Sequence, residues 1–149
     1  MSSDPSCFKI RARGTQAGVR LALAHVVDRL ASAGADRDFR GRAEIVLAEA
    51  LNNVVEHALH GQACLWVEIR ARKGDAGWHF LICDPGRPMP DGLLPQRRLP
   101  AVDAELAELP EGGFGWAMIR LLASAIEYSR RSGQNRLGFL IPHAASGPG

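Results

Sequence analysis

The spacing of apolar residues changes along this chain, and the order of those changes limits the folds that it can adopt. Residues 7–14 alternate between apolar and charged side chains, which is typical of a strand with one buried face. Residues 15–34 and 36–61 have helical spacing instead, and the second helix is expected to begin near Phe39–Arg42 and to end at Gly61. The N-terminal part of the chain therefore predicts one strand followed by two helices.

The first helix shows its ends and its buried side in the sequence. Thr15 is expected to be its N-cap and Gly34 its C-cap, because these residue types satisfy or tolerate the special positions at helix ends. The residues expected on its buried stripe are apolar: Val19, Leu23, Val26, Val27 and Leu30.

The remainder of the chain predicts two hairpins separated by a loop and a helix. The expected elements are strands at 64–72 and 78–84, a loop at 85–112, a helix at 114–124, and strands at 125–131 and 136–142. The turn sequences KGDAG and SGQN join the two strand pairs. The complete order predicts an α+β fold, a two-layer α/β sandwich whose mixed, mostly antiparallel sheet has helices on one face.

Composition sets limits on the class of protein. A chain of 149 residues fits one domain, expected at 7–142, with a flexible N-terminus at 1–6 and a disordered tail at 143–149. The formal net charge of +2 gives no reason to expect direct nucleic-acid binding, and no apolar run approaches the ~20 residues of a membrane helix. The three cysteines lack metal-ligand spacing and are expected to be reduced and mostly buried, which favours a cytoplasmic protein.

The loop at 85–112 is long for a compact domain, and loops of that length are usually functional. It contains six prolines, and a short helical turn is expected at 101–109. Arg97 and Arg98 within it are within reach of a bound phosphate in principle, although a solvated pair of loop residues is the favoured interpretation.

Three polar side chains recur every four residues on the second helix: Glu49, Asn53 and His57. On a regular helix they fall within roughly 80° of one another and span about 12 Å. An amide and a carboxylate beside apolar surface need partners, and a divalent ion with phosphate is one such partner. Taken alone, the stripe is better explained by rim residues of an amphipathic helix that are solvated or capped by their neighbours.

Two further motifs accompany the stripe. Asp84 ends an apolar strand and can accept a hydrogen bond from a ligand amino group, while Gly86 would let a ligand approach the backbone; an ordinary Asp-Pro-Gly turn is the alternative. Gly112, Gly113 and Gly115 precede and begin a helix, where free amides favour phosphate; a flexible helix start is the alternative.

In their order and spacing, the three motifs together resemble those of the GHKL ATPases, the family of gyrase, Hsp90, histidine kinases and MutL. Glu49-x-x-x-Asn53-x-x-x-His57 resembles the N box, Asp84-x-Gly86 the first glycine box, and Gly113-x-Gly115 the second, with residues 85–112 as the ATP lid. The similarity extends from residue 7 to 142. Within the superfamily, EALNNVVEHA and GGFGWAMIRLLAS are most similar to the anti-sigma factor serine/threonine kinases of bacterial partner-switching modules.

The resemblance implies ATP and Mg²⁺ as cofactors, with a role for each motif. It makes Glu49 the general base, Asn53 the metal ligand, and Asp84 with Gly86 the adenine site. The phosphates would lie on Gly112, Gly113 and Gly115, and His57 would line the nucleotide site.

The resemblance also implies partners: a STAS-domain anti-anti-sigma factor as phosphoacceptor, a sigma factor or equivalent client, and a second copy of the chain in a homodimer. Two alternatives remain open. One is a nucleotide-gated sequestration module without kinase activity, and the other is a detached histidine-kinase catalytic domain.

Overall fold

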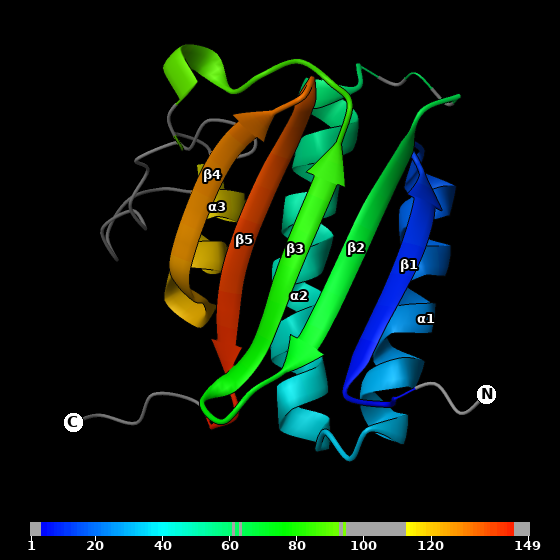
Figure 1. Cartoon of the computed structure of the whole chain (residues 1–149), viewed down its shortest axis with the longest axis vertical. Coiled ribbons are helices and arrows are strands. Elements are labelled where there is room, and N and C mark those ends of the chain that lie inside the picture. Colours follow the sequence, from blue (N-terminus) through cyan, green and yellow to red (C-terminus); the bar gives the residue numbers. More distant parts are fainter. Residues whose placement is uncertain (1–3, 61, 63, 93, 95–112, 145–149) are drawn as a thin grey trace, which may run out of the picture.

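The computed structural model describes residues 4–60, 62, 64–92, 94 and 113–144, and these form a five-stranded sheet with helices packed on one face (Figure 1). The strands are β1 (Cys7–Arg13), β2 (Trp66–Lys73), β3 (Gly77–Asp84), β4 (Ser124–Arg131) and β5 (Gln134–Pro142). The helices are α1 (Gln16–Ser32), α2 (Arg37–Asn53) and α3 (Gly113–Leu122), with a π-helical turn η1 (Val54–Ala58) and a 3₁₀ turn η2 (Pro90–Gly92).

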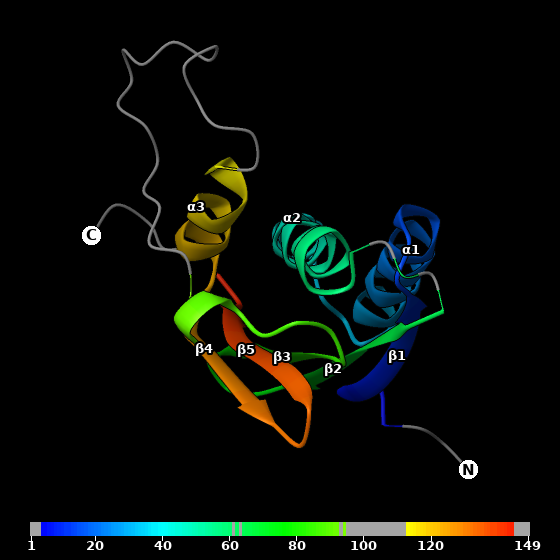
Figure 2. The ribbon, with the colours of Figure 1, turned by 90° about the horizontal axis from the view of Figure 1, so that it is seen from above.

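The sheet has the order β1-β2-β3-β5-β4. Strands β2 and β3 form one hairpin and β4 and β5 another, and β3 pairs with β5 although α3 and β4 lie between them in the sequence. The predicted α+β sandwich is confirmed. One detail differs, because every described strand pairing is antiparallel, whereas a mixed sheet was expected. Figure 2 shows all three α-helices on the same side of the sheet.

The caps explain where the helices begin. The Thr15 side chain accepts a hydrogen bond from the Gly18 amide at 2.9 Å, as expected for an N-cap. The C-cap of α1 is Ala33, and Gly34 follows it with a φ of +88°, a conformation that suits glycine. Helix α2 begins earlier than expected, since Asp36 accepts from the Phe39 amide at 2.8 Å and so starts the helix at Arg37.

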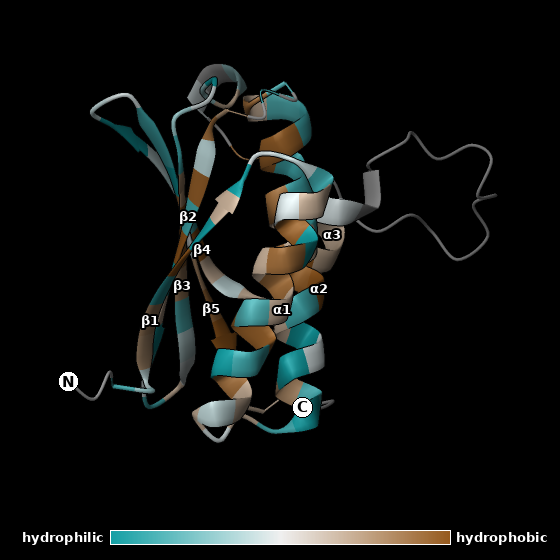
Figure 3. Ribbon diagram, turned by 90° about the vertical axis from the view of Figure 1, so that its right-hand side faces the viewer, coloured by the Kyte–Doolittle hydropathy of each residue, from teal (hydrophilic) through white to brown (hydrophobic). Residues whose placement is uncertain are grey.

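The core lies between the helix layer and the facing side of the sheet (Figure 3). Val19, Val26 and Leu30 of α1 are buried as predicted, whereas Leu23 and Val27 are only half-buried. Large side chains from the sheet complete the core, with Trp78 and Phe80 stacked on β3. Alternation along β3 and β5 therefore fixes which residues face the helices.

Three expectations about the periphery need correction or comment. Only Cys83 is a buried cysteine, whereas Cys7 and Cys64 are exposed. His143, which was assigned to the disordered tail, is held by hydrogen bonds from its amide to Ala76 and from Arg42 to its carbonyl. Within the described part of the chain, each helix is too short or too polar to cross a membrane.

Candidate functional site

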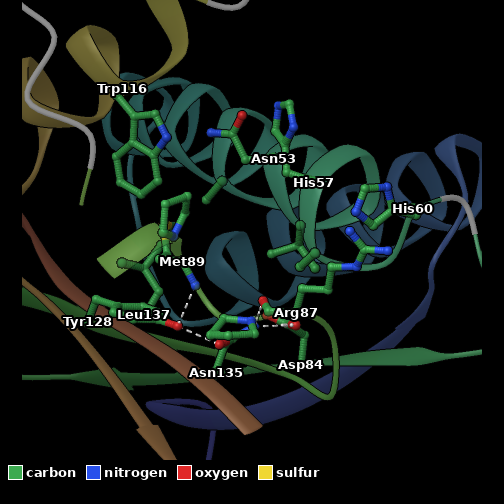
Figure 4. Close-up of a pocket in the computed structure, with 15 residues that line it drawn as sticks. Asn53, His57, His60, Asp84, Arg87, Met89, Trp116, Tyr128, Asn135 and Leu137 are labelled. Carbon is green, nitrogen blue, oxygen red and sulfur yellow. Dashed lines mark hydrogen bonds between the residues drawn. The ribbon is translucent and has the colours of Figure 1, made fainter. Parts of the chain in front are cut away.

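A cavity of about 610 Å³ lies between the C-terminal end of α2, the start of α3 and the segment that follows β3 (Figure 4). Its walls are mostly apolar, with a few polar side chains at defined places. The lining residues used below are Asn53, His57, Asp84, Met89, Trp116 and Asn135. An apolar cleft with few convergent polar groups is typical of a small-molecule site.

The α2 side of the cavity does not have the regular helix that the sequence predicted. From Val54 to Ala58 the backbone is π-helical, and the Leu59 amide bonds to the Val54 carbonyl at 2.9 Å. A π turn advances each residue by a smaller angle than an α turn, so His57 does not continue the line of Glu49 and Asn53. The His57 side chain is 75% exposed and lies at the edge of the cavity.

Glu49 and Asn53 both face the start of α3. A Cβ atom on Gly115 would lie 2.7 Å from Glu49 Oε2 and 3.8 Å from Asn53 Nδ2. Glu49 is half-buried and lies outside the residues that line the cavity, whereas Asn53 lines it. The second glycine motif is thus packed directly against the polar stripe.

The amide nitrogen of Asn53 is buried and has no hydrogen-bond partner among the described residues. An unsatisfied buried donor costs about 1–3 kcal/mol, so native proteins rarely keep one without a functional reason. This atom lies beside the amino-terminal turn of α3, where backbone amides are not used within the helix. The Asn53 amide and the start of α3 form one of the polar regions of a mostly apolar cavity.

Asp84 marks another wall of the cavity and is 3% exposed. Its Oδ1 atom accepts hydrogen bonds from the Gly86 amide at 2.8 Å and from Asn135 Nδ2 at 3.0 Å. Burial raises the pKa of this carboxyl above its ordinary value, while the two hydrogen bonds and the nearby Arg130 oppose that rise. Because the described donors both use Oδ1, Oδ2 is left for a ligand donor.

Asn135 holds the segment after β3 in place. Its Nδ2 atom donates to the Arg87 carbonyl at 2.7 Å as well as to Asp84, and its Oδ1 atom accepts from Tyr128 and from Arg130. The Tyr128 hydroxyl accepts in turn from the Met89 amide at 2.9 Å. The β4–β5 hairpin therefore fixes the wall of the cavity that contains Asp84.

Gly86 allows a close approach within the protein itself. A Cβ atom there would lie 2.5 Å from the Ala58 carbonyl oxygen, which already accepts from the Arg87 amide at 2.9 Å. The structure therefore shows a close approach between this segment and the π turn, and the approach of a ligand to Gly86 stays a prediction.

The structure brings Asn53, His57 and Asp84 to the cavity and places Glu49 and Gly115 beside it. Gly113 is the first residue of α3. Gly112, Arg97, Arg98 and the helical turn expected at 101–109 lie outside the described residues.

Sequence reasoning missed Trp116, Tyr128 and Asn135 as residues of this site. One signal for Asn135 was present, because it occupies an inward position of β5 in phase with Leu137, Phe139 and Ile141. A buried amide in an apolar strand pattern needs partners, and those partners form the network described above. Trp116 gave no comparable signal, since a helical aromatic most often belongs to a core.

The polar side chains around the cavity suit a cofactor that itself carries anionic groups. No cluster of three or more His, Cys, Asp or Glu side chains is placed to hold a metal in the described ranges. Mg²⁺ commonly uses one or two protein oxygens and takes the rest of its ligands from phosphate and water. The side-chain oxygen of Asn53 would be one such ligand, while its buried Nδ2 donor, beside the start of α3, suits a phosphate oxygen.

Comparison with known proteins agrees with this geometry. A family model described as histidine kinase-like ATPase domain matches residues 12–140. The solved structure of the RsbU and RsbW domains of Rv1364c from Mycobacterium tuberculosis matches with a TM-score of 0.60 at 19% sequence identity. That match covers 91% of this chain but 32% of the other, so this chain spans about a third of that protein's length. The comparison with curated protein sequences found no match to this chain.

Proposed function

This chain belongs to the histidine kinase-like ATPase domain family, and from that premise we propose that it binds Mg-ATP in the cavity and phosphorylates a protein serine. One observation carries the proposal. Glu49 and Asn53 meet Gly115 at the start of α3, beside the cavity that Asn53 lines. A base, an oxygen ligand and free helix amides at one place are the components that phosphoryl transfer requires.

Each end of the cavity has its own task in this proposal. Asp84 accepts a hydrogen bond from the adenine amino group through Oδ2, and the apolar walls, including Met89 and Trp116, contact the base. Asn53 would hold the metal through its side-chain oxygen, and the amides of α3 from Gly113 would bind phosphate. When bound, ATP would supply the phosphoryl group, and Mg²⁺ would offset the negative charge on the phosphate oxygens.

Glu49 acts as the general base. Its carboxylate accepts the proton of the serine hydroxyl as the hydroxyl oxygen bonds to the γ-phosphorus, and the bond from that phosphorus to the ADP oxygen breaks. Half-burial of Glu49 beside Gly115 restricts the positions that the carboxylate can adopt. The transfer therefore depends on how α2 packs against α3.

The proposed partners follow from the resemblance to partner-switching kinases. The phosphoacceptor is a STAS-domain anti-anti-sigma factor, and the client released by it is a sigma factor or an equivalent protein. A phosphoserine adds about −1.5 to −2 charges, which explains release of the antagonist after transfer. Strand β1 lies at an edge of the sheet, where a homodimer of this chain would extend the pairing.

The first experiment is thermal unfolding with and without Mg-ATP or Mg-ADP. Ligand at about 100 times its dissociation constant stabilises by roughly 2.7 kcal/mol, or on the order of 5–10 °C for a chain of this size. A phosphotransfer assay with radiolabelled ATP and a STAS-domain acceptor follows, using Glu49→Ala as the matched variant. Glu49→Ala is expected to keep the Mg-nucleotide shift and to lose transfer.

The outcomes separate the alternatives. Nucleotide binding without transfer to any acceptor would favour a sequestration module, and transfer to histidine would favour a detached histidine-kinase domain. Normal serine phosphorylation by Glu49→Ala would exclude this glutamate as the base. Absence of a wild-type thermal shift would remove the premise that the cavity binds a nucleotide.

A further inference from the structure

The side of the sheet that faces away from the helices carries concentrated positive charge. No described element covers this side, here called the outer sheet face (Figures 2 and 3). Its basic residues are Lys9, Arg11, Arg13, Arg70, Arg72, Arg131 and Arg136. The carboxylates on its described strands are Glu68 and Glu127. Since the whole chain has a formal net charge of only +2, the positive charge is gathered on one surface.

The outer sheet face does not neutralise its own charge. Lys9 lies opposite Arg70 in the strand register, and both contact the same carboxylate, Glu68, at 3.5 and 2.9 Å. Arg72 and Arg136 have no carboxylate partner among the residues that the structure describes. One carboxylate shared by two opposed cations leaves net positive charge on this face, which the carboxylates of a bound partner would offset.

An aromatic ring and two aliphatic side chains accompany the charges. Trp66 is 37% exposed, and the guanidinium groups of Arg11 and Arg13 lie 4.8 and 4.9 Å from its ring centroid. Leu81 and Leu140 are half-buried on the central strands β3 and β5. Arginine and tryptophan around an apolar centre are the residue types most enriched where proteins bind other proteins.

We propose that the outer sheet face docks a protein whose surface presents carboxylates around an apolar centre. The planar fork of arginine pairs with carboxylates in a bidentate way, and the basic residues here are arginines except for Lys9. Steering by opposite charge would speed the encounter of the two proteins.

Two other occupants fit less well. A single-stranded nucleic acid stacks its bases on open aromatic rings, whereas the Trp66 ring already has Arg11 and Arg13 over it. Glu68 and Glu127 would also repel phosphates. A second copy would bring the same basic face against itself if the two faces paired symmetrically.

This proposal does not depend on the nucleotide site. The cavity opens among α2, α3 and the segment after β3, whereas the docking residues lie on the opposite side of the sheet. Loss of docking and loss of nucleotide binding can therefore be measured separately.

The test uses a synthetic Glu/Leu peptide as the acidic probe, with a Lys/Leu peptide of equal length and a single-stranded DNA as comparison probes. Binding is followed by tryptophan fluorescence, because Trp66 is exposed whereas Trp78 and Trp116 are buried. The variant is Arg72→Glu with Arg136→Glu, and the control is Arg20→Glu with Arg37→Glu, which changes the net charge equally on exposed helix positions. Circular dichroism and the thermal unfolding temperature verify that each variant is folded.

Docking predicts that the Glu/Leu peptide binds the wild type, that the sheet variant binds it at least about tenfold more weakly, and that the helix control stays within about twofold. The affinity should fall as salt is raised. Equal weakening in both variants, or no peptide binding to the wild type, would overturn the proposal. Tighter binding of DNA would assign the face to nucleic acid instead, and loss of self-association in the sheet variant would assign it to a second copy.

Discussion

Gly115 and Glu49 are in direct contact: a Cβ atom at residue 115 would come within 2.7 Å of the glutamate Oε2 atom. The two residues belong to different helices, and their approach joins the glycine motif of α3 to the polar stripe of α2. The contact is close enough that the smallest side chain would displace the carboxylate. It supplies the most direct test of the site.

Gly115→Ala should leave the fold intact and reduce phosphotransfer by about tenfold or more. The added methyl group meets the end of a flexible side chain, so Glu49 can move, but a base displaced by about 1 Å loses most of its effect. Gly41→Ala is the matched control, because it lies in α2 with nothing within 4 Å of the new Cβ. That control should be stabilised by about 0.5–1 kcal/mol with unchanged transfer. Equal rates for both variants and the wild type would show that the Gly115 contact does not position the base.

Asn53→Ala should stabilise the nucleotide-free protein and abolish the Mg-nucleotide shift. The substitution removes a buried donor without a partner, which is worth on the order of 1 kcal/mol, or about 2–4 °C. Asn52→Ala is the control, because Asn52 is the exposed neighbour of Asn53 in α2 and the substitution changes helix propensity by the same amount. Differential scanning calorimetry with and without Mg-ADP measures both effects. A nucleotide shift that persists in Asn53→Ala would contradict the assignment of a metal ligand.

Asp84→Asn should change ligand preference. The Gly86 amide and Asn135 Nδ2 would donate to the side-chain oxygen of the new asparagine. Its NH₂ group would then point into the cavity and face the adenine amino group, which is also a donor. Two opposed donors should weaken adenine nucleotides by about 10–100-fold. Isothermal titration with ADP and GDP is the measurement. An unchanged ADP affinity would mean that Asp84 does not contact the base.

The same variant should reveal the titration of Asp84. Burial raises the folded-state pKa of this carboxyl, so the folded protein binds the proton more tightly than the unfolded chain does. The stability due to this group is therefore fully present below its ordinary pKa of 3.8 and is lost as pH rises through the folded pKa. Urea unfolding should show the wild type losing stability relative to Asp84→Asn across that window. Parallel profiles for wild type and Asp84→Asn would contradict the raised pKa.

Tyr128→Phe should loosen the wall of the cavity without removing its apolar surface. The Met89 amide loses its acceptor, which is worth about 1 kcal/mol, and the segment after β3 becomes less well held. Nucleotide affinity should fall several-fold with little change in the transfer rate at saturation, because Tyr128 bonds to the Met89 segment and not to the Glu49–Gly115 contact. A fall in the saturated rate alone would place Tyr128 in the chemistry instead.

Much of this architecture could be predicted from local patterns. The alternation in β1 and the helical spacing of α1 and α2 place apolar residues on one side, so element type and order follow from the sequence. The pairing of Glu49 with Asn53 follows from the same geometry. The position of His57 does not follow from that geometry, because the helix changes to a π turn at Val54. The four-residue spacing from Asn53 then no longer fixes the direction of the His57 side chain.

The sequence by itself determined the helix cap at Thr15, the strand phases and the candidate polar stripe, because each depends on residues only a few positions apart. Only the tertiary structure decided that Asn135 would hold Asp84, that Gly86 would meet Ala58, and that Gly115 would meet Glu49. These contacts join residues distant along the chain, and their partners are set by strand register and helix packing. Local periodicity states which side of an element is buried, but not what it is buried against.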